Sequence, residues 1–314
     1  MPIGGFLNYP GLTTFPGFTL YPGLNPYPGT PLGSPTTFTL QGDAGQLGLN
    51  VLDVNGVKWI VRQFDGWGSP HPTIQVVQKP RQLGAWAGLS YPQARYLSMQ
   101  VMVVAPTPTL LNTSLDNLYA MVDYNNTVFT VAEAGYTRSM VVRRSDEILH
   151  SRVNSTIANV TFQMVAVDPR KLGYAVSGNT ALPSSTGGLT IPFTVPFSIN
   201  SVVANGNVTL TNTGNTQGPV KLRIDGPVQG PVITHSGTGA PLVFSSSLNL
   251  GAGEWLTVDM VSRTALANDQ SSRASYITSR GWSSFDPGVN TWSFTAVSYD
   301  PNARLTVTAA PAWN

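Results

Sequence analysis

Apolar and polar residues alternate with a period of two over many short segments of this chain. Near the C-terminus, Leu256, Val258 and Met260 alternate with more polar neighbours. Alternation of this kind is typical of a β-strand with one buried face. Turn sequences separate the segments, such as Asn268-Asp269 and Asp286-Pro-Gly-Val-Asn290, in which Pro fixes φ and Gly supplies a positive φ. The pattern therefore predicts a mainly β protein.

The segments fall into two groups, which predict two domains. Residues 36–178 are predicted to form a β-rich domain, with strands at 97–104, 127–133, 138–143 and 157–167. Residues 179–196 contain Pro183-Ser-Ser-Thr-Gly-Gly188 and are predicted to be a linker. Residues 197–314 are predicted to form a β-sandwich, because their strands are short and evenly spaced. Those strands are expected near 207–212, 219–225, 231–234, 241–245, 254–260, 274–277, 290–298 and 303–308.

One helix is predicted within the first domain. Thr113, followed by Asp116 three residues later, is expected to cap its start. Its apolar residues have the spacing of one helical face. They are Leu111, Leu115, Leu118 and Val122.

An aromatic-Pro-Gly unit recurs every six residues in the first part of the chain, 1–35. Pro followed by Gly favours a type II turn, and Pro does not fit inside a sheet. The segment has too few aliphatic residues to build a core. It is either a flexible tail or an arm that docks on a neighbouring subunit, and we favour the arm. Its docking residues are then Tyr9, Phe15, Tyr21 and Tyr27.

Composition narrows the function classes. The 314 residues include 17 Lys and Arg, 15 Asp and Glu, and no Cys. A net charge of +2 gives no field that would attract nucleic acid or a membrane surface. Without Cys there are no disulfides, no thiolate chemistry and no Cys-based zinc sites. Charged residues are 10% of the chain, and such low charge favours a part of an assembly over a free monomer. Neither a signal peptide nor a membrane span is expected.

We find no sequence pattern for catalysis. His71, His150 and His235 are far apart, and each is expected to be a surface or loop residue. No Gly-x-Ser-x-Gly or Walker-type loop occurs. We therefore expect no catalytic residue, no metal ligand and no cofactor, and we predict that the chain is not an enzyme.

Aromatic residues of the second domain offer the one alternative to a purely structural surface. Trp292 shares a strand face with Phe294 and is expected in the core. Trp255, Trp282 and Tyr299 are candidates for a surface that binds a glycan or a protein partner. We favour packing or a subunit interface over glycan binding for these residues.

The order of several motifs resembles a known family. The second domain contains Gly253-Glu-x-Leu-x-Val-Asp259, Ser272-Arg-x-x-Tyr276, Trp282-x-x-Phe-x-Pro-Gly-x-Asn290 and Leu305-Thr-Val-Thr308 before Trp313. The first domain contains Val57-Lys-Trp59, Asp65-Gly-Trp67, Val141-Val-Arg-Arg144 and Val167-Asp-Pro-Arg-Lys171. Together they resemble the distal tail proteins of siphophages, the phages with long non-contractile tails, especially those that infect actinobacteria. The resemblance covers roughly residues 50–175 and 205–314.

The resemblance implies a virion structural protein of the tail tip, assembled in the host cytoplasm. Copies of the chain would form a ring, expected to be a hexamer, through residues 36–178. The ring would join the tail tube protein to the tip or hub protein. A galectin-like or carbohydrate-module-like sandwich would point outward. Two alternatives remain: a receptor-recognition protein that binds host cell-wall glycan, and a major tail tube subunit.

Overall fold

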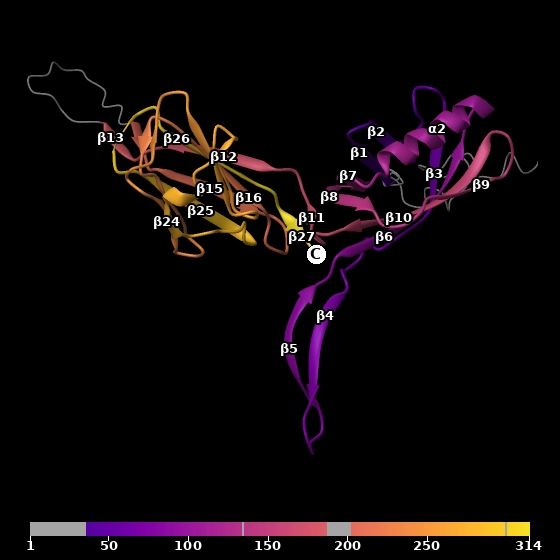
Figure 1. The fold of residues 1–314 in the computed structure, drawn as a ribbon, viewed down its shortest axis with the longest axis horizontal. Helices are drawn as coiled ribbons and strands as arrows, with labels where there is room; N and C mark the ends of the chain where they lie inside the picture. The colour runs from indigo at the N-terminus through magenta and orange to yellow at the C-terminus, as the bar shows by residue number, and fades with distance from the viewer. Residues whose placement is uncertain (1–35, 134, 187–201, 299) are drawn as a thin grey trace, which may run out of the picture.

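The computed structural model describes residues 36–133, 135–186, 202–298 and 300–314. These residues form two β domains that meet near the C-terminus, and a long hairpin projects from the junction (Figure 1). The prediction of a mainly β chain is confirmed. The predicted docking residues Tyr9, Phe15, Tyr21 and Tyr27 lie outside the described residues, as does Tyr299.

The first domain is built on a 10-stranded sheet whose main path runs β2-β1-β7-β8-β10-β6-β3. Phe38 of β1 and Phe64 of β3 lie toward opposite ends of this path, yet their ring centroids are only 5.0 Å apart. The sheet must therefore curl around one shared core. Its strands are β1 Thr37–Gly42, β2 Gly45–Leu49, β3 Lys58–Asp65, β6 Arg95–Val104, β7 Thr127–Glu133, β8 Tyr136–Arg144, β9 Leu149–Arg152, β10 Ile157–Ala166, β11 Lys171–Leu172 and β27 Ala312–Trp313.

Helix α2, Pro108–Met121, packs its apolar stripe into this core. The predicted stripe is confirmed, because Leu111, Leu115, Leu118 and Val122 are all buried. The predicted start at Thr113 is wrong. Thr107 is the N-cap, and its hydroxyl accepts a hydrogen bond from the Leu110 amide over 3.2 Å. Pro108 then fills the first helical position, where its missing N–H costs nothing.

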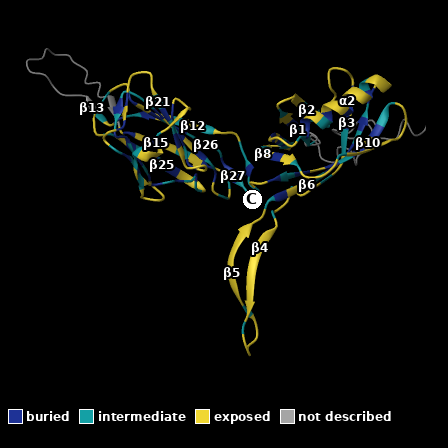
Figure 2. Cartoon of the chain, viewed as in Figure 1, coloured by how far each residue is buried: buried dark blue, intermediate teal, exposed yellow. Residues whose placement is uncertain are grey.

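Strands β4 Pro72–Gln78 and β5 Ala85–Pro92 form a hairpin that pairs with no other described strand. It leaves the domain between β3 and β6 (Figure 1). Nearly all of its residues are exposed, as the continuous yellow of Figure 2 shows. The sequence analysis did not predict it.

The second domain is a sandwich of a six-stranded sheet, β12-β26-β16-β21-β22-β23, and a five-stranded sheet, β15-β25-β18-β19-β24. The predicted sandwich architecture is present, with a core between the sheets that includes Trp292 and Phe294. Its strands are β12 Val176–Ala181, β15 Asn207–Asn212, β16 Val220–Asp225, β18 Val232–His235, β19 Pro241–Phe244, β21 Trp255–Asp259, β22 Thr264–Ala267, β23 Ser271–Ser272, β24 Ile277–Arg280, β25 Gly288–Thr295 and β26 Arg304–Ala309. Two short pairs flank it, β13 Ser184–Thr186 with β14 Val202–Ala204, and β17 Val228–Gln229 with β20 Asn249–Leu250.

Two predictions about this domain are corrected. The expected linker 179–196 overlaps β12, which pairs with β26 along its whole length, from Val176↔Ala309 to Ala181↔Arg304. The prediction rested on Pro183-Ser-Ser-Thr-Gly-Gly188, which begins after β12 ends. Within β12, a Cβ on Gly178 would lie 2.9 Å from Val208 of the facing sheet, so the glycine permits close packing. Residues 274–277 are mostly a 3₁₀ turn, Ala274–Tyr276, before β24 begins.

The chain returns to the first domain at its last strand. Strand β27 pairs with β11 through Lys171↔Trp313 and Leu172↔Ala312, and β11 in turn pairs with β8. Residues far apart in sequence therefore meet at the junction of the two domains. This return was not predicted, because a two-residue strand leaves no alternation to detect.

Candidate interaction surfaces

The described residues contain no group of three or more His, Cys, Asp or Glu that could hold a metal ion. No helix in the same residues is long and apolar enough to cross a bilayer. His71 and His150 are exposed, as expected. His235 is not a surface residue, since only 2% of it is exposed. It continues the alternation of β18, with Ile233 on the same face, and packs in the sandwich.

His235 is held by Asn290, which also closes the Asp286–Asn290 turn. The His235 Nε2 and Asn290 Oδ1 atoms are 3.0 Å apart. The Asn290 side chain also accepts from the Asp286 amide and donates to the Asp286 carbonyl oxygen. The His235 ring lies 4.9 Å from that of Trp292. These contacts give His235 a packing role.

Trp255 and Trp282, two of the three residues of the predicted aromatic surface, come from different sheets of the second domain. Trp255 faces outward from β21, and its indole N–H donates to Asp269 Oδ2 over 3.1 Å. The Arg223 guanidinium lies 4.6 Å from the Trp255 ring centroid and covers one face of it. Trp282 follows β24 of the other sheet and packs against the core. The two side chains therefore do not form one stacking platform.

The β4–β5 hairpin carries a group of exposed apolar side chains. Its base is fixed, because buried Arg95 donates to the carbonyl oxygens of Gly66 and Pro169, each over 3.0 Å. No acidic residue occurs between Asp65 and Asp116, whereas the hairpin tip carries Lys79 and Arg81. Its exposed apolar side chains are Ile74, Val76, Val77, Leu83, Trp86, Leu89 and Tyr91.

A groove of about 610 Å³ lies at the junction of the domains. Arg138 of β8 is stacked there, with its guanidinium carbon 4.4 Å from the Trp313 ring centroid and 5.2 Å from that of Tyr136. Tyr174 on the rim is 77% exposed. Sequence reasoning missed this site, because its parts come from 133–138, 173–176 and 311–313 and only the β11–β27 pairing brings them together.

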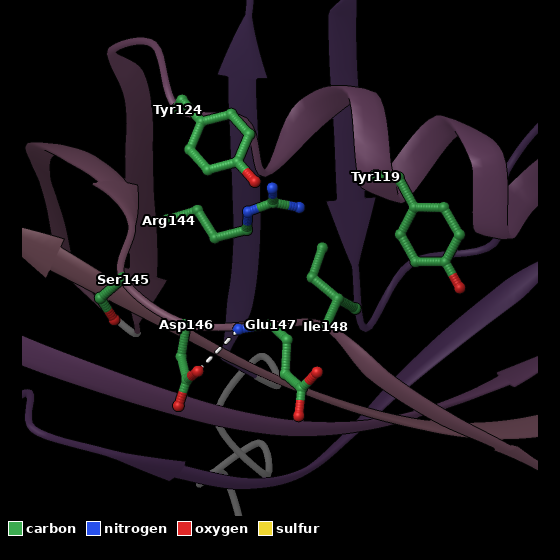
Figure 3. A pocket seen from close by; sticks show the side chains of 7 residues that line it. All are labelled: Tyr119, Tyr124, Arg144, Ser145, Asp146, Glu147 and Ile148. Atoms are coloured by element: carbon green, nitrogen blue, oxygen red, sulfur yellow. Dashed lines mark hydrogen bonds between the residues drawn. The ribbon is translucent and has the colours of Figure 1, made fainter.

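The opposite end of β8 carries a second open pocket (Figure 3). Arg144 stacks on Tyr124, with its guanidinium carbon 4.0 Å from the ring centroid. Tyr119 forms a hydrogen bond with His150, with its hydroxyl 2.9 Å from Nδ1. The carboxylates of Asp146 and Glu147 point away from the Arg144 guanidinium. This end of the strand is therefore acidic at its rim.

Comparison with known proteins gives a structural match. No protein-family model matches the sequence, and no curated protein matches it. Among solved structures, the chain is similar to the Dit protein of phage SPP1, presented as a paradigm of the hub adsorption apparatus in phages that infect Gram-positive bacteria. The TM-score is 0.59 at 13% identity, over 90% of this chain and 100% of that one. The chain has the Dit fold.

A second similar structure is a chain of the phage P2 baseplate in its activated conformation with calcium. Its TM-score is 0.49 at 9% identity, over 88% of this chain and 98% of that one. At these identities the likeness concerns fold alone, so function must be argued from the surfaces described above.

Proposed function

We propose that this chain is a structural subunit of a bacteriophage tail tip. Copies of it form a ring, expected to be a hexamer, that joins the tail tube to the tip or baseplate. The fold shared with SPP1 Dit over nearly the whole chain supports this proposal. The first domain forms the ring, and the sandwich points outward as a docking surface.

The observation that carries the proposal is the β4–β5 hairpin. An isolated two-stranded hairpin is marginally stable in water, and its unpaired edges and apolar side chains attract partners. Here the hairpin is anchored firmly at its base by Arg95 and is exposed over its length. A neighbouring copy that covers it would bury its apolar side chains and satisfy the free edge of a strand. This is the behaviour of an assembly subunit.

The proposed partners follow from the proposed location between the tail tube and the tip. They are further copies of the chain, the tail tube protein and a tip or hub protein. The chain is placed in the virion and assembled in the host cytoplasm. No catalytic role, cofactor or nucleic-acid specificity is assigned to it.

A glycan-binding role for the second domain has less support. Trp255 is covered on one face by Arg223, and Trp282 packs against the core. The number of copies per particle distinguishes the proposed tip ring from a role as the major tail tube subunit. Tube subunits stack in many rings, whereas a tip ring occurs once.

The test is the assembly state of the purified chain and its number of copies in the phage particle. Native mass spectrometry and negative-stain microscopy should find closed rings of the chain, and particles should hold one ring. A chain that stays monomeric at high concentration contradicts the proposal. Many stacked rings in one particle would instead favour the tube subunit.

A further inference from the structure

Arg138 is prepared to bind a carboxylate. Its guanidinium is held between the rings of Tyr136 and Trp313, and Trp313 is backed by Gly173, where a Cβ would lie 2.9 Å from the indole. Its Nε is buried and has no hydrogen-bond partner among the described residues. A buried donor without a partner is unfavourable. A carboxylate in the groove can accept from the terminal nitrogens of the same guanidinium in a charge-assisted hydrogen bond.

The surroundings of Arg138 carry excess positive charge. Lys171, only 6% exposed, lies 5.1 Å from the Trp67 ring and has one long hydrogen bond, of 3.4 Å, to the Asn314 carbonyl oxygen. Burial, together with the charges of Arg95 and Arg138, lowers the pKa of Lys171 to about 8. Glu133 at the rim partly offsets these charges. An acidic ligand in the groove would relieve this repulsion.

An acidic group without a cationic partner lies at the other end of the same strand. Asp146 and Glu147 follow β8, are exposed, and make no ion pair with any described residue. The Glu147 amide donates to Asp146 Oδ1 over 2.8 Å, which orients the Asp146 carboxylate, and the Glu147 side chain extends on the same side (Figure 3). The exposed side chain of Leu149 continues the segment.

The two sites lie at the two ends of one strand, β8. Arg138 and Asp146 are eight residues apart, or about 26 Å in extended chain. A contact between opposite ends of identical subunits is heterologous, and it closes into a ring when the rotation permits. The charges match across such a contact, and they cannot meet within one chain.

We propose that the acidic 145–148 loop of one copy inserts into the Arg138 groove of the next copy. The acidic pair then lies against Arg138, within the positive field to which buried Lys171 contributes, and Ile148 and Leu149 bring apolar surface to the exposed ring of Tyr174. This inference rests on the proposed ring and identifies one of its contacts. It is separate from the hairpin contact, which involves other strands.

Charge reversal on each side tests the contact in the full-length chain. The groove variant is Arg138→Glu, and the loop variant combines Asp146→Arg with Glu147→Arg. Each variant alone should weaken association at least tenfold, as measured by sedimentation velocity and native mass spectrometry. Circular dichroism should confirm that each is folded. The loop variant changes only exposed side chains, so it remains decisive if the groove variant misfolds. Arg62→Glu is the matched control for Arg138→Glu at an exposed position outside both sites, and it should assemble normally.

Mixing the two variants gives the sharper result. Every contact between unlike copies then pairs opposite charges, and every contact between like copies pairs equal charges. The mixture should form rings of strictly alternating copies at a 1:1 ratio, at concentrations where neither variant forms rings alone. Combining all three substitutions in one chain should also restore rings. If the wild-type chain forms rings and a variant with either charge reversal forms them equally well, this inference is wrong and the proposed function still stands. A mixture that stays dissociated would overturn it too, whereas a monomeric wild-type chain would count against both.

Discussion

Arg170 donates from Nη1 to the carbonyl oxygen of Gln217 over 2.7 Å, and so connects the segment that leaves the first domain to a loop of the second. Asp168 orients the same guanidinium through two parallel hydrogen bonds, Nε to Oδ1 at 2.9 Å and Nη2 to Oδ2 at 2.6 Å. Burial acts to raise the pKa of Asp168, but the hydrogen bonds and charge of Arg170 outweigh it and lower that pKa.

Replacing Arg170 should therefore loosen the junction between the domains. Arg170→Lys keeps the charge but loses the planar fork, and we expect it to cost about 1 kcal/mol, because the pair is partly exposed. Asp168→Asn should cost a similar amount at pH 7. The lowered pKa means that the contribution of Asp168 is present above its unfolded pKa and is lost as pH falls below it. Urea unfolding at pH 7 and at pH 3 measures both effects. A difference between wild type and D168N that does not shrink at pH 3 contradicts this account.

The hairpin should be dispensable for folding and necessary for assembly. Thr73 and Tyr91 are paired, so residues 74–90 can be replaced by Asn-Gly, which forms a two-residue hairpin turn. We expect the shortened chain to unfold cooperatively at nearly the wild-type temperature but to remain monomeric by native mass spectrometry. Lys79→Gln with Arg81→Gln is the control, since it keeps both strands and should still assemble. A shortened chain that forms normal rings would show that the hairpin faces solvent in the particle.

Asn290 should be the most sensitive polar residue of the sandwich. Its side-chain amide forms hydrogen bonds with buried His235 and with the partly buried backbone of Asp286, so Asn290→Ala leaves these groups without their partners. The expected loss is about 2–4 kcal/mol in the free energy of unfolding. Asn302→Ala, at an exposed position, should change it by less than about 0.5 kcal/mol. Equal effects of the two substitutions in urea unfolding would refute this role.

Lys171 should make the stability of the monomer depend on alkaline pH. Its pKa is about 8 in the folded chain against an ordinary value of 10.5, so the unfolded chain binds the proton more strongly. The free energy of unfolding contributed by this group therefore rises as pH increases from about 8 to 10.5. Wild type should gain stability relative to Lys171→Met between pH 7 and pH 10. Parallel pH profiles for the two proteins would disprove the assignment.

The N-terminal arm remains a prediction from the sequence. Deleting residues 1–33 should leave both domains folded but lower the temperature at which rings dissociate, because regularly spaced aromatic rings suit pockets on an adjoining subunit. Changing Tyr9, Phe15, Tyr21 and Tyr27 to Ser should act almost like the deletion. Differential scanning calorimetry of assembled rings gives the comparison, and unchanged dissociation temperatures would make the arm a passive tail.

Local patterns predicted local structure well. The apolar stripe of α2 and most strands of the sandwich lie where their periodicity places them. The helix start was missed because the Thr-Asp signal at Thr113 competes with Thr107-Pro108, which combines a cap with a proline at the first helical position. The start of the linker was misjudged because Pro183-Ser-Ser-Thr-Gly-Gly188 is rich in turn formers, whereas the residues just before it, up to Ala181, pair with β26.

The candidate sites were harder to predict, because they depend on contacts between distant segments. Arg138 and Trp313 are 175 positions apart, and no periodicity links them. The hairpin carries a weak signal in the apolar residues Ile74, Val76 and Trp86, but with both faces exposed it lacks the clear alternation of a half-buried strand.

The return of β27 to β11 also determines how the outer sandwich can move. The chain enters the sandwich at 173–175 and leaves it at 310–311, and the Gly173 amide donates to the Pro311 carbonyl oxygen over 2.8 Å between these two crossings. A domain joined by one segment can rotate about that segment. Two segments that are hydrogen-bonded to each other oppose this rotation and leave bending at the junction as the easier motion. A sideways force on the sandwich is therefore transmitted to the first domain through both segments together.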